Sequence, residues 1–340
     1  MKLLFIVKNR EFPYSLDQGL ECYSTPFSSG LYNSVSFVNR MLQEHGFDSN
    51  LESAIDNNCI DRLITLHNPT HVILEALWVV PSKVEALQKL HPSVKWIVRL
   101  HSEVPFIAVE GIFSEWIFDY NRLGVEVTAN SPRMVEALEI KLQKEIGYTP
   151  NYYFMTKNER SKYSYDLDIG CFGAIRTLKN HLIQALAAIK YADRHQLKLN
   201  FHVNSSRIEG EGSPVLKNLR GLFDNINHNL IEHDWLDHIQ FKELVGSMDA
   251  VMQCSFTETY NVVAADAVSM NIPIVSSKEI KFINRIFAAD PTDVNAICKK
   301  LENALIGDEF NLQILNRWHL SCNNRNAIKA WKRYLNHLSY

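Results

Sequence analysis

Short runs rich in Val, Ile and Leu alternate with longer helical patterns along this chain, and the alternation limits what it can fold into. In the first half the expected strands are Lys2–Lys8, Ser49–Ala54, His71–Leu77, Val94–Leu100 and Val125–Asn130. The expected helices between them are Leu31–His45, Cys59–Leu66, Ser82–Leu90, Phe106–Asn121 and Arg133–Ile146. Strands that alternate with helices form a parallel sheet covered on both faces. The first half is therefore predicted to be one complete, doubly wound α/β domain.

The same alternation returns after an interruption. From Tyr148 to Tyr165 the chain has Pro, Asn, Lys, Ser and Tyr residues without helical periodicity, which is typical of a connection between domains. Beyond it the expected strands are Leu167–Phe172, Leu197–Asn204, Ala250–Ser255 and Ile272–Ser276. The expected helices are His181–Ala192, Val215–Asp224, Val262–Met270 and Asp293–Ile306. A second Rossmann-like domain is therefore predicted, in agreement with a length of 340 residues, because one hydrophobic core rarely supports so long a chain.

Composition excludes several classes of protein. The formal net charge of −3 argues against a large basic surface for non-specific nucleic-acid binding. The six cysteines include no CxxC pair, which favours reduced thiols in a cytoplasmic protein over disulfides or a zinc site. The apolar run Leu3–Val7 is too short for a signal peptide, and no run approaches the roughly 18 apolar residues that span a bilayer. A soluble, cytoplasmic protein without a transmembrane segment is expected.

The most specific motif is the segment Ser255-Phe-Thr-Glu258-Thr-Tyr-Asn261-Val-Val-Ala-Ala-Asp266-Ala267, followed by Asn271-Ile-Pro-Ile-Val275. It places a carboxylate in a loop between a strand and a helix, and backbone N–H groups at a helix start favour an anionic ligand. Glu258 and Asp266 are eight positions apart, which predicts that both lie on one side of that helix. The alternative interpretation is an ordinary helix with Glu258 as an acid near its positive end.

The second motif is Gly170-Cys-Phe-Gly173-Ala-Ile-Arg176-Thr-Leu-Lys179-Asn180, at the end of the first strand of the second half. Glycine lets the backbone approach a phosphate closely, and paired cations stabilise charge on a leaving diphosphate. Lys179, Arg176 and Gly173 are therefore candidates for diphosphate binding. The alternative is a solvated strand-to-helix loop, where Lys and Arg are common.

Together these two segments resemble the S-x-x-E-G-F-G-x-x-x-x-E-A and G-R-x-x-x-x-K-G/N motifs of retaining GT-B glycosyltransferases, those of family 4 and the glycogen-synthase type. The resemblance covers about 167–275 well. It implies two Rossmann-like domains facing a cleft, with residues 1–157 on the acceptor side and residues 166–308 binding the nucleotide-sugar. It also implies that residues 309–340 form C-terminal helices that cross back to the first domain, where the aromatic residues Trp318, Trp331 and Tyr334 serve as anchors.

The resemblance also implies roles for residues. The first acid, Glu258, binds hydroxyls of the donor sugar and acts in catalysis, and the second, Asp266, binds the ribose. Lys179 and Arg176 neutralise the diphosphate. Thr259, Tyr260 and Asn261 stand where the family has Gly-Phe-Gly, and are donor-binding positions; Asp266 replaces the usual Glu, and Arg176 comes two places later than the family's Arg. These departures leave the identity of the donor sugar open.

The first half carries weaker signals. Ser28-Ser29-Gly30 precedes a predicted helix, where the family brings a glycine loop to the diphosphate; a turn with an N-cap is the alternative. His101 ends a predicted strand, where the family often has a catalytic histidine; a structural histidine is the alternative. Glu103 and Glu110 are candidates for a base or for acceptor contacts. Ser131 is either the counterpart of a serine that the family has before the next helix, or simply an N-cap for a helix with Pro132 at its first position.

Three other patterns are not interpreted as sites. Asp166-Leu167-Asp168 resembles a metal-binding D-x-D but enters a strand from the connection between domains. His228, His233 and His238 recur every fifth residue, which suits neither one helix face nor a zinc pair. Gly210-Glu211-Gly212 lacks the third glycine of a dinucleotide fingerprint. No metal and no nicotinamide cofactor is expected.

The predicted function is transfer of a sugar from a nucleotide-diphosphate sugar, a UDP-sugar by preference, to an acceptor hydroxyl, with retention and without metal. Two acceptor classes stay open: a glycan or lipid-linked saccharide, and hydroxymethylated DNA bases of a bacteriophage. Lys329, Lys332 and Arg333 are candidate phosphate contacts for DNA; the alternative for them is a solvated helix face, and the acidic pI counts against DNA. The chain would then act in a bacterial cytoplasm, encoded by the bacterium or by a phage. The rival classes are a non-catalytic nucleotide-sugar binder and a sugar-nucleotide epimerase. The oligomeric state is left open.

Overall fold

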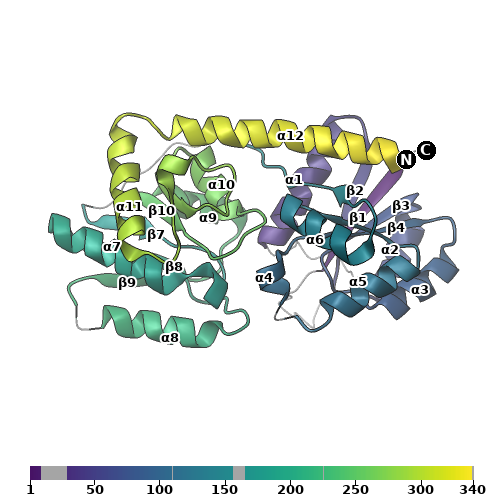
Figure 1. Cartoon of the computed structure of the whole chain (residues 1–340), viewed down its shortest axis with the longest axis horizontal. Helices are drawn as coiled ribbons and strands as arrows, with labels where there is room; N and C mark the ends of the chain where they lie inside the picture. The colour runs from purple at the N-terminus through teal and green to yellow at the C-terminus, as the bar shows by residue number, and fades with distance from the viewer. Residues whose placement is uncertain (9–28, 109, 156–164, 225, 339–340) are drawn as a thin grey trace, which may run out of the picture. The chain divides into compact units, whose positions relative to one another are not determined.

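The computed structural model describes residues 1–340 except 9–28, 109, 156–164, 225 and 339–340 (Figure 1). The chain forms two compact units, one made of Met1–Tyr153 with Asn324–Tyr340, the other of Phe154–Asn323. The expected connection around Lys157, the residue Ser28 before the first helix, and Cys22 lie outside the described residues.

The first unit is built on a parallel six-stranded sheet of order β2-β1-β3-β4-β5-β6. Its strands are β1 (Lys2–Lys8), β2 (Asp48–Ala54), β3 (His71–Glu75), β4 (Lys95–Leu100), β5 (Glu126–Ala129) and β6 (Gly147–Tyr148). Its helices are α1 (Gly30–Glu44), α2 (Cys59–His67), α3 (Pro81–Leu90), α4 (Val104–Ile107), α5 (Phe113–Arg122) and α6 (Pro132–Leu142). The single helix predicted at Phe106–Asn121 is thus two helices, α4 and α5.

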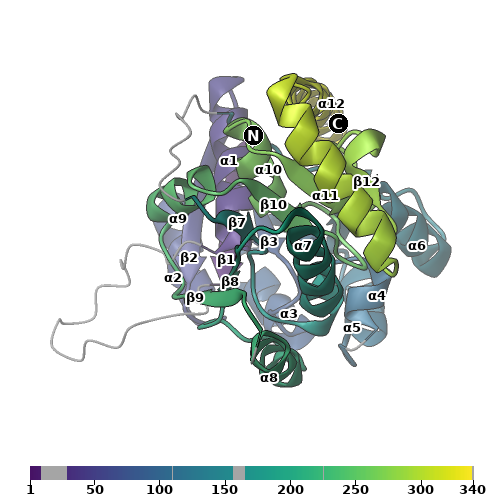
Figure 2. The same ribbon diagram turned by 90° about the vertical axis from the view of Figure 1, so that its left-hand side faces the viewer.

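The second unit repeats this plan with the order β12-β11-β10-β7-β8-β9, again all parallel. Its strands are β7 (Leu167–Gly170), β8 (Leu199–Asn204), β9 (Asn229–His233), β10 (Ala250–Gln253), β11 (Ile274–Ser277) and β12 (Ala288–Ala289). Its helices are α7 (His181–His195), α8 (Gly212–Phe223), α9 (His238–Gly246), α10 (Val262–Ser269) and α11 (Val294–Glu309), with short 3₁₀ turns η1 (Thr177–Lys179) and η2 (Arg285–Phe287). Helix α7 lies between α8 and α11, and α9 contacts α10 (Figure 2).

Besides the short 3₁₀ turns, three elements of the second unit have no counterpart among the sequence predictions: β9, α9 and the two-residue β12. The residues of β9 are half-buried rather than buried, since this strand lies at the edge of the sheet. An edge strand therefore lacks the continuous apolar run by which central parallel strands are recognised. Helix α9 begins at a capping aspartate, Asp237, whose side chain accepts from the N–H groups of Ile239 and Gln240 at 2.9 Å.

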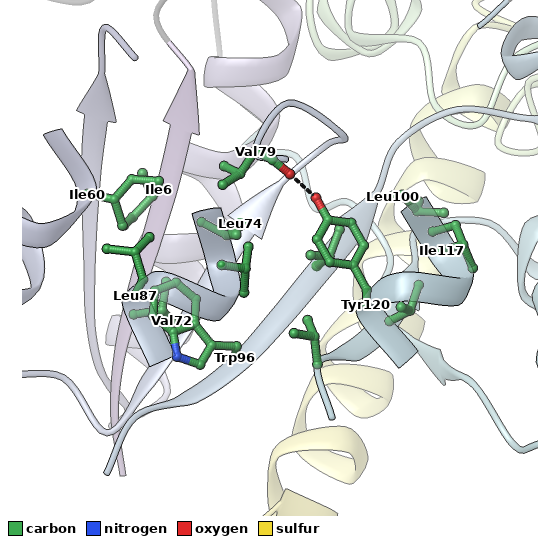
Figure 3. Packing of buried hydrophobic residues seen from close by; sticks show 14 of the residues in the cluster. Ile6, Ile60, Val72, Leu74, Val79, Leu87, Trp96, Leu100, Ile117 and Tyr120 are labelled. Carbon is green, nitrogen blue, oxygen red and sulfur yellow. Dashed lines mark hydrogen bonds between the residues drawn. The ribbon is translucent and has the colours of Figure 1, made fainter. Parts of the chain in front are cut away.

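The core of the first unit forms from strands that are buried on both faces and from the apolar sides of α2, α3 and α5 (Figure 3). Ile6, Val72 and Leu74 from β1 and β3 pack with Leu87 and Trp96. Each fully buried aliphatic side chain contributes about 1.5–3 kcal/mol relative to its exposed state.

Tyr120 of α5 is buried among them and donates its hydroxyl to the carbonyl of Val79 (Figure 3), which satisfies the one polar atom of the ring. Burial raises the pKa of this phenol well above its usual value.

The last helix, α12 (Ile314–Leu338), contributes to both units, because residues up to Asn323 belong to the second and those from Asn324 to the first. In the first unit the Asn324 side chain bonds the backbone N–H and carbonyl of Tyr153 at 3.2 and 2.7 Å. Trp331 is fully buried, donates to the carbonyl of Pro150 at 2.8 Å and packs edge-on against Phe5. The implied return of the C-terminal helix to the first unit is confirmed.

The strand order of the second unit determines where a ligand site is expected. From β7 the chain first adds β8 and β9 on one side and then β10 to β12 on the other. The topological switch point therefore lies between β7 and β10. In open α/β sheets ligands bind outside the carboxyl ends of the strands at this point.

Candidate functional site

Two loops meet at the switch point of the second unit, residues 171–180 after β7 and 254–261 after β10. The backbone N–H of Phe256 donates to the carbonyl of Leu178 at 3.0 Å. The Asn180 side chain donates to the carbonyl of Cys254 at 3.0 Å, and the Gln184 side chain accepts from the N–H of Cys254 at 2.7 Å. These contacts hold the two predicted motifs against each other, although they are some 80 positions apart in sequence.

Lys179 and Glu258 form a direct ion pair at the meeting point of these loops. Asn261 donates to the same Glu258 oxygen at 3.1 Å and to the Gln253 side chain at 2.8 Å. Gln253, within β10, is itself anchored on the carbonyl of Phe172 at 3.0 Å. A chain of hydrogen bonds from the sheet therefore fixes the orientation of Glu258.

Asn261 is also the N-cap of α10, since its side-chain oxygen accepts from the N–H of Ala264 at 2.8 Å. Because the helix begins only at Val262, Glu258 lies in the preceding loop. The prediction that Glu258 and Asp266 share one helix face is therefore wrong, and the spacing of eight says nothing about their separation.

Asp266 occupies the second turn of α10 and is buried, with 1% of its side chain exposed. His238, the first residue of α9, holds Asp266 Oδ1 through Nε2 at 2.8 Å. Burial lowers the pKa of Lys242, one turn further along α9, while the charge of Asp266 opposes that shift. The carboxylate of Asp266 therefore faces two basic side chains of the neighbouring helix.

The other candidates of the β7 loop differ in their surroundings. Gly173 has φ +113°, a conformation that side-chain-bearing residues avoid, and a Cβ there would lie 3.8 Å from Lys179 Cε. The backbone of Gly173 therefore runs beside the Lys179 side chain. Arg176 points elsewhere, to Glu209 at 3.3 Å, which in turn contacts Arg207.

Three further residues lie in or next to these two loops: Thr259, Tyr260 and His181. The ring of Tyr260 packs against Phe282 with centroids 5.2 Å apart, and Thr259 precedes it in the loop. His181 begins α7 and is buried beside this loop. Burial, with the charges of Lys179 and Arg176, lowers its pKa to about 3, so that the imidazole is neutral at physiological pH.

His101 and its partners form a buried cluster at the end of β4 in the first unit. Its Nε2 is bonded to the Glu75 carboxylate and lies 3.2 Å from Arg99 Nη1. Arg99 donates to Glu75 at 3.1 Å, to Asn151 Oδ1 at 2.5 Å and to the carbonyl of Thr149 at 2.8 Å. Burial and the charge of Arg99 lower the pKa of His101, which favours a neutral imidazole. Burial alone would raise the pKa of Glu75, but Arg99 and His101 hold it below its usual value.

The remaining first-unit candidates make local contacts. Glu103 is buried and accepts from Ser131 Oγ at 2.7 Å and from Arg133 at 3.2 Å, while Ser131 also caps α6 at the N–H of Met134. Gly30 opens α1, whose N-cap is Ser29. Glu110 is half-buried and lies three residues before α5.

Sequence reasoning missed three of these residues. Glu75 and Arg99 end or interrupt apolar strands, and a charge inside a buried strand is the signal that marks them. His238 was set aside because its spacing from His228 and His233 suits no metal site. Those two have other contacts, since His228 accepts from the N–H of Leu199 and His233 stacks on His202.

No protein-family model and no curated protein matches this sequence. Solved structures do match over the whole chain. Sucrose-phosphate synthase from Thermosynechococcus elongatus has TM-score 0.68 at 11% identity, covering 100% of this chain and 99% of that one. The HepE protein of Anabaena, solved with UDP-glucose, has TM-score 0.68 at 12% identity, with 99% of both chains covered. A glycosyltransferase from Rickettsia africae has TM-score 0.63 at 13% identity, again with 99% of both covered.

The chain has the GT-B fold. Its two parallel six-stranded sheets, each with helices in βαβ order, and the end-to-end match to these structures establish this architecture. At identities of this size the likeness concerns the fold. Lys179 and Glu258 lie at the switch point of the second unit.

Among the residues that the structure describes, no helix is long and apolar enough to cross a membrane. Within the same residues, no three His, Cys, Asp or Glu side chains gather in a way that would hold a metal ion.

Proposed function

We propose that this protein is a glycosyltransferase that transfers a sugar from a nucleotide-diphosphate sugar, a UDP-sugar, to a hydroxyl of an acceptor. The observation that carries the proposal is the ion pair of Lys179 with Glu258 at the switch point of the second unit. In this proposal Lys179 is the cation for the leaving diphosphate, and its partner Glu258 is the acid for the donor sugar. The structural likeness to HepE, which was solved with UDP-glucose, supports the choice of donor.

The chemistry needs few groups. The bond between the anomeric carbon and the diphosphate oxygen breaks, and its electron pair leaves with the diphosphate. The acceptor oxygen forms the new glycosidic bond, and its proton passes to the departing diphosphate oxygen. Lys179 and the N-terminus of α10 stabilise the charge that develops on the diphosphate. Glu258 accepts hydrogen bonds from the sugar hydroxyls and so positions the reacting carbon. Attack from the leaving-group face would give retention, which the anomeric configuration of the product tests.

Replacement of Lys179 by Ala should weaken UDP binding roughly ten-fold or more, because a charge-assisted contact contributes about 1.5–3 kcal/mol. Isothermal titration calorimetry with UDP measures this. Lys190→Ala is the matched control, since Lys190 is an exposed lysine of α7. Equal affinities for UDP in the Lys179 variant and the wild type would remove this residue from the site.

Activity should persist in excess EDTA, because Lys179 supplies at the diphosphate the positive charge that a metal ion supplies in other transferases. The measurement is release of UDP from UDP-sugar with and without the chelator. Loss of activity in EDTA that Mn²⁺ restores would contradict the proposed chemistry.

The acceptor is identified by offering UDP-sugars together with either a saccharide acceptor or hydroxymethylated DNA, and weighing the products by mass spectrometry. A mass increase of one sugar on either acceptor identifies its class. Tight UDP-sugar binding without turnover on any acceptor would instead indicate a non-catalytic nucleotide-sugar binder.

A further inference from the structure

Helix α12 is buried on one face and exposed on the other. Its buried positions recur every three or four residues, so they share one face of an unbroken helix (Figure 1). They are Asn316, Leu320, Asn324, Ala327, Trp331, Tyr334 and Leu335. A helix of 25 residues is about 37 Å long at 1.5 Å per residue. The outer face of α12 is therefore a long surface that the fold leaves open to another molecule.

The outer face begins with large apolar side chains. Ile314 and Trp318 lie one helical turn apart, and 57% and 61% of their surfaces are exposed. Phe310, at the end of α11 just before this helix, is 70% exposed. Single exposed apolar residues are common, but several large ones in one short segment are typical of a surface that contacts a partner or a membrane.

The same face continues as a row of cations. Arg325, Lys329 and Lys332 come seven, eleven and fourteen residues after Trp318, which places them within about 40° of it around the helix axis. Arg333 lies next to them, and all four cations are exposed. The whole helix contains five Lys and Arg residues and no Asp or Glu, although the chain has a net charge of −3. Within the described part of the chain, no acid pairs with Lys329, Lys332 or Arg333.

The cations fit a polyanion, and the apolar end of the face indicates which one. Anionic lipid headgroups and a nucleic-acid backbone both attract a row of Lys and Arg. Indole and aliphatic side chains gain free energy at the boundary between headgroups and acyl chains, where tryptophan is enriched. The phosphates of a duplex offer Ile314 no apolar partner. A second copy of this chain would bring like charges together, which is unfavourable.

We propose that the outer face of α12 binds the surface of an anionic lipid bilayer. Ile314 and Trp318 insert at the level of the headgroups, and the cations of the row contact lipid phosphates. The helix lies along the surface and does not cross it. This proposal goes beyond the transferase function and does not depend on it, since no residue around Lys179 and Glu258 takes part.

Co-sedimentation of the full chain with lipid vesicles tests the proposal. Vesicles of phosphatidylcholine with about a third phosphatidylglycerol should be bound far more tightly than vesicles of phosphatidylcholine alone. Each Lys or Arg near an anionic surface contributes about 1 kcal/mol, which is about five-fold in affinity. Joint replacement of Lys329, Lys332 and Arg333 by Ala should therefore weaken binding about a hundred-fold. About 1 M salt should release the wild-type protein, because it screens these charges.

Trp318→Ala removes the apolar anchor without a change of charge, and should weaken binding at least about ten-fold. Phe118→Ala is its matched control, since Phe118 is a 56% exposed aromatic residue of α5. For the cations, the control is joint replacement of Lys198, Lys217 and Arg220 by Ala, which removes the same charge from exposed positions elsewhere in the second unit. Both controls should bind within about two-fold of the wild type.

Four results would overturn the proposal. Equal binding to neutral and anionic vesicles would exclude the charge contact. An equal loss in the two triple variants would indicate a diffuse effect of charge. Tighter binding to duplex DNA than to vesicles, unaffected by Trp318→Ala, would make the face a nucleic-acid site. Self-association without lipid, measured by sedimentation velocity and abolished by Trp318→Ala, would make it an interface between two copies. Affinity for UDP, measured on the same variants, should not change, so failure of lipid binding and failure of the transferase proposal are separate results.

Discussion

Replacement of Glu258 by Gln is expected to lower turnover of the UDP-sugar by about two to three orders of magnitude, the loss typical for removal of one group that acts on the transition state. Affinity for UDP itself should stay close to that of the wild type, because UDP carries no sugar for this acid to bind. Gln keeps an oxygen for the hydrogen bond from Asn261, which is 3.1 Å in the wild type, so the loop should keep its conformation. Steady-state kinetics and calorimetry on the same preparation measure both quantities.

Glu243→Gln is the control for this change, since Glu243 is an exposed acid on α9 in the same unit. It should alter neither quantity. Full turnover in the Glu258 variant, or a loss of UDP affinity as large as that of Lys179→Ala, would show that Glu258 does not contact the transferred sugar.

Replacement of Trp331 by Ala should destabilise the first unit by about 3–5 kcal/mol, the cost of truncating a large buried aromatic residue. The indole is fully buried, packs against Phe5 with centroids 5.9 Å apart and donates to the carbonyl of Pro150. It also covers the buried guanidinium of Arg99, whose Cζ lies 5.3 Å from the ring centroid. Urea denaturation, followed by circular dichroism, measures the change.

Trp318→Ala is the matched control on the same helix, because this tryptophan is 61% exposed. Exposed substitutions usually stay within about 0.5 kcal/mol. Trp331→Phe should lie in between, since it keeps an apolar ring but leaves the carbonyl of Pro150 without its donor. Similar unfolding curves for Trp331→Ala and Trp318→Ala would mean that the C-terminal part of α12 does not stabilise the first unit.

The elements that the sequence predicted well are those whose neighbours along the chain determine them. Strands β1, β3 and β10 are buried inside their sheets, and each contains a run of at least three apolar residues. The caps Ser29 and Asn261 come directly before their helices. The edge strand β9 was not predicted, because its partly exposed residues do not form a continuous apolar run. Helix α9 was also not predicted, because its apolar and polar residues are not clearly divided between two faces. Asp237 is nevertheless a residue typical of a helix N-cap.

The candidate site divides in the same way. The motifs around Lys179 and Glu258 were recognisable because a strand-end loop and its helix are contiguous in sequence. Arg176 was paired with Lys179 because the loop resembles a family motif, and in the fold Arg176 contacts Glu209. Asp266 was assigned a role from its position in a motif. In the fold its side chain is buried and is bonded to His238 of α9.

By itself, then, the sequence determined the two α/β domains, the identity of the strands at the centre of each sheet and the two loops that carry charge, because each depends on residues within a few turns of one another. Only the tertiary structure decided that Lys179 meets Glu258, that His238 covers Asp266 and that Trp331 covers Arg99. Their partners are 79, 28 and 232 positions away, and a contact over such distances follows from strand order and helix packing, which local sequence patterns do not encode.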